Sequence, residues 1–177
     1  MKLSTKDIVI SGLFAAITAV LAQITIPFPG VPFTMQVFAV TLSGVVLGAK
    51  RGFLSQIIYV LLGAIGLPVF AGFSGGLPII VGPTGGFIIT FPIMALIVGY
   101  VSYKFKDIKY IMSTMLIAII INYTVGAAQY ALVANVGFLK ALTICCLPFV
   151  VVDLIKISLA TVIGCNVKKR VNLCVMR

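Results

Sequence analysis

Two opposite charges stand inside one of the most apolar stretches of the chain. The segment PFVVVDLIKISLATVIG carries Asp153 and, three residues later, Lys156, a spacing that places both side chains on one face of a helix. Ionisable residues within membrane segments are costly and are functional candidates by default. An aspartate accepts hydrogen bonds from N–H groups and a lysine attracts a carboxylate, so the pair predicts a site for a polar ligand. The alternative is a self-satisfied ion pair that only orients its helix.

Two further segments carry groups suited to binding. The stretch GPTGGF at 82–87 ends a loop and opens a predicted helix, so its backbone N–H groups could face a ligand. No lysine follows its glycines, which argues against a phosphate loop, and a turn needed only for tight packing explains it equally well. Another predicted helix carries Asn122, Tyr123, Gly126 and Gln129; polar groups at such spacings indicate either hydrogen bonds between helices or a cavity wall.

The residue inventory argues against catalysis and metal binding. The chain contains no histidine, which removes the commonest general base and metal ligand. Its cysteines, Cys145, Cys146, Cys165 and Cys174, form no metal-ligand or disulfide pattern. A single buried acid is a poor basis for acid–base chemistry. We therefore expect no enzyme activity, no metal and no cofactor.

The composition requires a membrane protein. Hydrophobic residues make up 62% of the 177 residues and charged residues 9%, whereas soluble domains carry about a quarter charged residues. The apolar runs are contiguous and lack the alternation of a barrel strand, so helices must satisfy the backbone within lipid. The net charge of +10 is spread over short clusters between these runs, which disfavours nucleic-acid binding and is typical of membrane topology.

Apolar runs and breakers predict a single all-α domain, 1–177, with six spanning helices. Eleven of the 13 basic residues, including Lys2, Lys106 and Arg177, fall on one side of these spans, which places both termini in the cytoplasm. The second and third helices are short for a span of about 20 residues. The predicted helices cover 7–26, 34–49, 52–66, 86–103, 108–134 and 141–167.

The long outer connection at 67–85 is uncharged and contains Gly, Pro, Phe and Ser74. Long loops without secondary structure in compact proteins are usually functional or disordered, and the apolar residues here favour a packed lid.

The first predicted helix carries small residues at regular spacing. Ser11, Ala15 and Ala19 are spaced by four, as are Gly12 and Ala16. Small residues at this spacing let a second helix approach closely, either in a partner or within the chain.

Four segments in this order, VPFTMQVFAVTLSGVVLGAKRG, YVLLGAIGLPVFAGFSGGL, GPTGGF and DLIK, together resemble the BioY family. Its members are biotin-specific substrate-binding (S) components of energy-coupling factor (ECF) transporters, and the resemblance covers nearly the whole chain. It implies the S-component fold, capture of biotin at the outer face and no cofactor. It also implies a multi-pass protein of the bacterial cytoplasmic membrane that assembles with a transmembrane scaffold (T) component and two ATPases.

The resemblance also implies roles for individual residues. Asp153 and Lys156 match the family's Asp-x-x-Lys pair, 82–86 match its Gly-Pro-Thr-Gly-Gly turn, and Gln36 falls on its PFT-x-Q pattern. Phe87 stands where the family often has tyrosine, so any contact from that hydroxyl is missing. The alternative function is an accessory membrane subunit whose charge pair is purely structural. The expected biotin contacts are Gln36, Ser74, Thr84, Gly85, Gly86, Phe87, Tyr123, Gln129, Asp153 and Lys156, and the expected docking residues are Ser11, Ala15 and Ala19.

Overall fold

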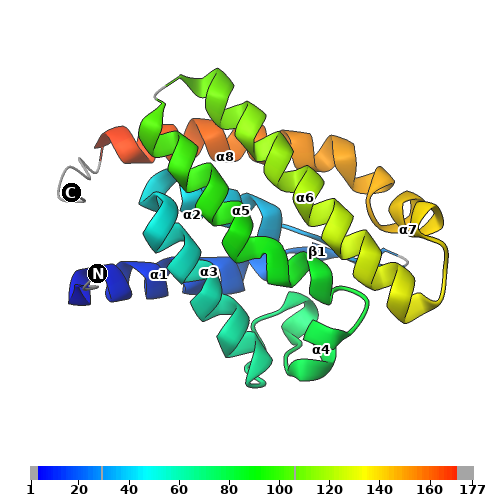
Figure 1. Ribbon diagram of the computed structural model, residues 1–177. Helices are drawn as coiled ribbons and strands as arrows, with labels where there is room; N and C mark the ends of the chain where they lie inside the picture. Colours follow the sequence, from blue (N-terminus) through cyan, green and yellow to red (C-terminus); the bar gives the residue numbers. More distant parts are fainter. Residues whose placement is uncertain (1–3, 29, 106, 171–177) are drawn as a thin grey trace.

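The fold is a bundle of helices whose longest members run roughly along one another (Figure 1). The computed structural model describes residues 4–28, 30–105 and 107–170; Lys2, Lys106, Cys174 and Arg177 lie outside these ranges. Four helical segments are long and apolar enough to cross a membrane by length and composition: Thr5–Ala22, Gly85–Lys104, Ile108–Ala134 and Phe138–Arg170. The first five predicted helices correspond to α1 (Thr5–Ala22), α2 (Gln36–Leu47), α3 (Ala49–Ala64), α5 (Gly85–Lys104) and α6 (Ile108–Ala134).

Local sequence signals account for several helix ends. Ser4 and Asp7 form a capping box at the start of α1, which satisfies two of its orphan N–H donors. Asp107 caps α6 at its start, and Asn135 adopts the left-handed conformation (φ 51°) at its end. Gly48, with φ 79°, separates α2 from α3, because a positive φ costs glycine little.

The sixth predicted helix, 141–167, is wrong as a continuous element. It is divided into α7 (Phe138–Cys145), the short 3-10 helix η2 (Leu147–Phe149) and α8 (Val150–Arg170). Pro148 has no N–H to donate to the preceding turn, so an uninterrupted helix is disfavoured there. The break makes Asp153 part of the first turn of α8.

The connection at 67–85 is also more ordered than predicted. It contains the 3-10 helix η1 (Ala71–Phe73) and the short helix α4 (Leu77–Val81). The connection between α1 and α2 forms a two-strand hairpin, in which β1 (Thr25–Ile26) pairs antiparallel with β2 (Phe33–Thr34). Both connections therefore have defined positions over the bundle (Figure 1).

Helix α5 lies at the centre of the packing, against α2, α3 and α6. Glycines make this possible: a Cβ on Gly44 of α2 would lie 2.8 Å from Ala95 O, and a Cβ on Gly99 of α5 would lie 2.4 Å from Ala49 N. Association of helices in lipid depends on such close approach rather than on a hydrophobic drive. The α2–α5 and α3–α5 contacts thus depend on residues without side chains.

The small-residue face of α1 packs inward, against α3. Ser11 and Ala15 are buried, and the Ser11 hydroxyl donates to Arg51 O at 3.2 Å. Ala19 is only half-buried, and Ala16 is exposed on another face of the helix. Of the three expected docking residues, Ser11 and Ala15 are thus buried within this chain, and only Ala19 keeps partial exposure.

Charged contacts gather where the start of α1 and the end of α8 lie, at one end of the bundle (Figure 1). Arg51 at the start of α3 pairs with Asp7 of α1. Lys168 near the end of α8 donates to Ser102 O at 2.8 Å, near the end of α5. The described basic residues at these positions fit one polar end of a membrane bundle.

The close helix contacts predict that alanine at Gly99 destabilises the protein and that alanine at Gly12 does not. Gly99→Ala forces a Cβ against the backbone of Ala49, so we expect a loss of about 1–3 kcal/mol in the free energy of unfolding. Gly12→Ala is the control, since a Cβ there meets nothing within 4 Å and alanine favours helix over glycine. Thermal unfolding in detergent measures both variants; equal midpoints would contradict the packing argument.

Candidate ligand-binding site

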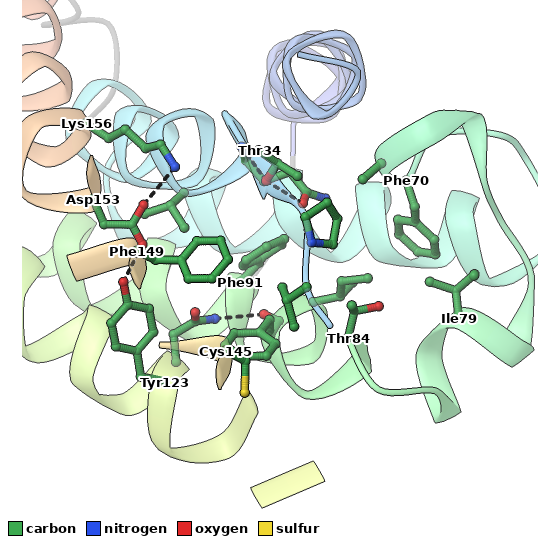
Figure 2. A pocket seen from close by; sticks show the side chains of 18 of the residues that line it. Thr34, Phe70, Ile79, Thr84, Phe91, Tyr123, Cys145, Phe149, Asp153 and Lys156 are labelled. Atoms are coloured by element: carbon green, nitrogen blue, oxygen red, sulfur yellow. Dashed lines mark hydrogen bonds and ion pairs between the residues drawn. The ribbon is translucent and has the colours of Figure 1, made fainter. Parts of the chain in front are cut away.

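A cavity of about 250 Å³ lies between α2, α5, α6 and α8, and residues of the α1–α2 and α3–α5 connections also line it. Ligand pockets commonly begin near about 300 Å³ and are mostly apolar with few polar groups, so this one suits a compact ligand. Its apolar wall includes Val37, Phe70, Ile79 and Phe91, and Figure 2 shows the polar groups that converge on it. A small ligand would lie between apolar surfaces and meet its polar partners at a few points.

The two charges of α8 form one side of this cavity. Lys156 Nζ lies 2.8 Å from Asp153 Oδ1, and the Tyr123 hydroxyl donates to Asp153 Oδ2 at 2.7 Å (Figure 2). Asp153 is 3% exposed and Lys156 6% exposed. A buried pair is tolerable only when good geometry and further hydrogen bonds compensate its desolvation. Here Tyr123 supplies that further bond, and the ammonium keeps N–H donors that Asp153 does not use.

The helix break at Pro148 explains where Asp153 lies. A carboxylate in the first turn of a helix is stabilised by the aligned peptide dipoles, and Asp153 occupies that turn of α8. Lys156 follows three residues later on the same face, so its ammonium reaches back to the carboxylate. An uninterrupted helix over 141–167 would have left Asp153 without this favourable field.

Aromatic rings form another part of the wall. Phe149 of η2 lines the cavity and stacks on Phe33 of β2, with ring centroids 4.1 Å apart. Phe28 meets both rings edge-on, at 5.2 Å and 5.8 Å. The hairpin connection is thereby fixed to the start of α8, beside the charge pair.

The connection between α3 and α5 covers the opposite side of the cavity. Gln23, which follows α1, donates to Phe70 O at 3.1 Å and accepts from the Phe73 N–H at 2.8 Å. The Tyr59 hydroxyl donates to Val69 O at 3.1 Å and accepts from Gln36 Nε2 at 2.7 Å. Backbone groups of the connection are thus held by Gln23, just after α1, and by Tyr59 of α3. Tyr59 is in turn hydrogen-bonded to Gln36, which lines the cavity.

Seven of the ten expected contacts line this cavity, and three do not. Gly85, Gly86 and Gln129 lie outside it. A Cβ on Gly85 would lie 1.7 Å from Ile80 O, and one on Gly86 would lie 2.7 Å from Val125 O, so close packing accounts for both glycines. Gln129 donates to Ile80 O and Gly82 O, both at 2.8 Å, and thereby holds the turn before α5. The seven residues that line the cavity are Gln36, Ser74, Thr84, Phe87, Tyr123, Asp153 and Lys156.

Sequence reasoning missed several lining residues. Phe149 was hidden by the predicted continuous helix, and Phe70, Phe91 and Cys145 look like ordinary apolar residues of spanning segments. Asn122 carried a usable signal, because a buried amide in an apolar helix needs hydrogen-bond partners. Spacing alone did not show that Asn122 and Tyr123 both line the cavity.

Comparison with known proteins gives this arrangement a family. Residues 1–173 match the BioY family. The chain is 46% identical to a probable biotin transporter BioY of Pyrococcus horikoshii, covering 92% of this chain and 96% of that protein, and 40% identical to the biotin transporter BioY of Thermotoga maritima, covering 93% and 96%. It is also similar to a crystal structure of the S-component for biotin from an ECF-type ABC transporter, with a TM-score of 0.85, 27% identity and 95% of both chains covered. The chain belongs to the BioY family.

Proposed function

We propose that this chain is the S component of an ECF transporter and captures biotin in the cavity beside Asp153 and Lys156. The observation that carries this proposal is a buried acid–base pair, held by Tyr123, on the wall of a compact and mostly apolar cavity. Biotin offers two ureido N–H donors, a carboxylate and an apolar ring and chain. The cavity supplies acceptors, an ammonium and apolar surface to match them.

The orientation and the partners belong to the same proposal. The chain is a multi-pass membrane protein with its basic end and both termini in the cytoplasm, so the cavity and its two covering connections face outward. The T component and two ATPases bind from other chains and supply the energy of ATP. Lipid surrounds the exposed apolar faces, and the membrane is the cytoplasmic membrane.

Binding of biotin by the purified chain tests the proposal directly. The protein in detergent, titrated with biotin in a calorimeter, should bind one molecule per chain. The competing function, an accessory membrane subunit whose ion pair is structural, predicts no binding.

The charge pair should be required for binding. Truncating one partner of a buried hydrogen-bonded pair costs about 2–5 kcal/mol, so Asp153→Asn or Lys156→Met should weaken biotin binding roughly 30-fold or more. Each single change also leaves a buried charge uncompensated and lowers the yield of folded protein. The double variant should recover folded protein but not binding.

Asp107→Asn is the matched control for this series. Asp107 is an exposed acid at the start of α6, and asparagine caps a helix equally well. Biotin affinity should not change in this variant. Recovery of binding in the double variant would show that the pair only maintains the fold.

The connection at 67–85 should close over the ligand, because an uncharged, Gly-rich segment can exclude water from an apolar site. Hydrogen exchange of its amides should slow when biotin saturates the protein. Gln23→Ala removes the acceptor of the Phe73 N–H, so exchange at Phe73 and the rate of biotin release should both rise. Thr143→Ala, at an exposed position of α7, should do neither. Equal exchange with and without biotin would contradict a closing lid.

Docking of the T component should use the outward face of α1. Ala16 lies there in an apolar groove with Leu13, Ile17 and Val20. Ala16→Trp should abolish co-purification with the T component while leaving biotin affinity near normal, since the groove and the cavity share no lining residue. Ala15→Trp, at a buried position, should instead reduce folded protein. Co-purification of Ala16→Trp with the T component would place the docking surface elsewhere.

A further inference from the structure

Asn122 is a polar residue of the cavity wall that the charge pair does not explain. It belongs to α6, one position before Tyr123, and is 1% exposed. Its side chain lines the same cavity as Asp153 and Lys156. A buried amide needs partners for both its oxygen and its nitrogen, so each end of the group can be examined separately.

The surroundings fix which end of the amide faces the protein. Asn122 Nδ2 lies 2.8 Å from Phe87 O and 2.5 Å from Thr90 Oγ1. The Thr90 hydroxyl donates its own proton to the backbone of α5, at 2.9 Å from Phe87 O and 3.2 Å from Gly86 O. Both neighbours of Asn122 are therefore acceptors at these points, and only the NH₂ end of the amide can satisfy them.

The opposite end of the amide is left as an acceptor without a donor. No described residue donates to Asn122 Oδ1. Among the described residues, the fully enclosed side-chain oxygen without a partner is Gln56 Oε1, so Asn122 Oδ1 is open to the cavity that its residue lines. A buried acceptor left unpaired is unfavourable, and a ligand N–H would remove that cost.

We propose that Asn122 determines specificity by accepting a hydrogen bond from a ring N–H of the ligand. This inference rests on the proposed function, in which the ligand is a cyclic urea with two N–H donors. The hydroxyls of Ser74 and Thr84, which also line this cavity, can donate as well as accept, so they discriminate poorly between ligand groups. The Asn122 oxygen can only accept, and it therefore selects ligands that present an N–H.

The same geometry separates a positioning role from a binding role. Thr90 touches Asn122 Nδ2 but does not line the cavity. Thr90→Val weakens the attachment of the amide to α5 and leaves the acceptor in place. Asn122→Ala removes both the attachment and the acceptor. Only the second variant should lose the ability to recognise an N–H.

The experiment compares biotin with two analogues in which one or the other urea nitrogen is methylated. The unaltered protein should bind at least one analogue roughly 10-fold to 100-fold more weakly than biotin, because the methyl group replaces the N–H that Asn122 accepts. Asn122→Ala should bind biotin more weakly by a similar factor, and the difference between biotin and that analogue should largely disappear. Thr90→Val should keep the difference, and Thr124→Ala, on the exposed side of α6, should match the unaltered protein.

Four results would overturn the inference. Equal affinity of the unaltered protein for biotin and both analogues needs no variant to fold and would exclude an N–H contact at Asn122. An unchanged ratio of affinities in folded Asn122→Ala, or loss of the ratio in Thr90→Val as well, would assign Asn122 a structural role. If the unaltered protein binds no biotin, the proposed function itself fails, and this inference fails with it.

Discussion

The cost of placing an aspartate and a lysine inside an apolar helix constrains the rest of the site. Asp153 and Lys156 neutralise each other, but a buried pair remains unfavourable without further hydrogen bonds. Tyr123 must therefore come from α6 at the right height, and α8 must begin close to Asp153 so that its dipole stabilises the carboxylate. The break at Pro148 and the packing of α6 against α8 together meet these two requirements.

The helical segments were largely predictable because lipid imposes length and apolarity on them, and most boundaries of the first five lie close to the predicted ones. The failures occurred where local geometry competes with composition. The run over 141–167 is apolar throughout, so hydropathy could not distinguish one helix from α7, η2 and α8. The small residues of α1 fitted close packing with either a partner or this chain, and only the fold shows that Ser11 and Ala15 are buried within the chain.

Some residues of the site could likewise be predicted from the sequence, and others could not. Asp153 and Lys156 could be found from the sequence, because their types are exceptional in that setting. From the sequence, Gly85 and Gly86 fitted either ligand contact or close packing. A Cβ on either residue would collide with a backbone oxygen, of Ile80 or Val125, which favours packing. Gln129 and Asn122 looked alike as polar residues of one helix. Gln129 donates to Ile80 O and Gly82 O in the turn before α5, whereas Asn122 lines the cavity. This difference depends on which backbone carbonyls lie near each amide.

The covering connections show how an uncharged segment can be placed accurately over an apolar site. Such a segment cannot use ion pairs, so its backbone groups need neutral donors and acceptors from the bundle. Gln23 and Tyr59 supply them to residues 69–73, and Gln129 supplies them to residues 80–82. Neutral hydrogen bonds contribute only about 0.5–1.5 kcal/mol each, so a few of them can order the connection and still permit it to open. Charged attachments in the same place would have held it shut or drawn water into the cavity.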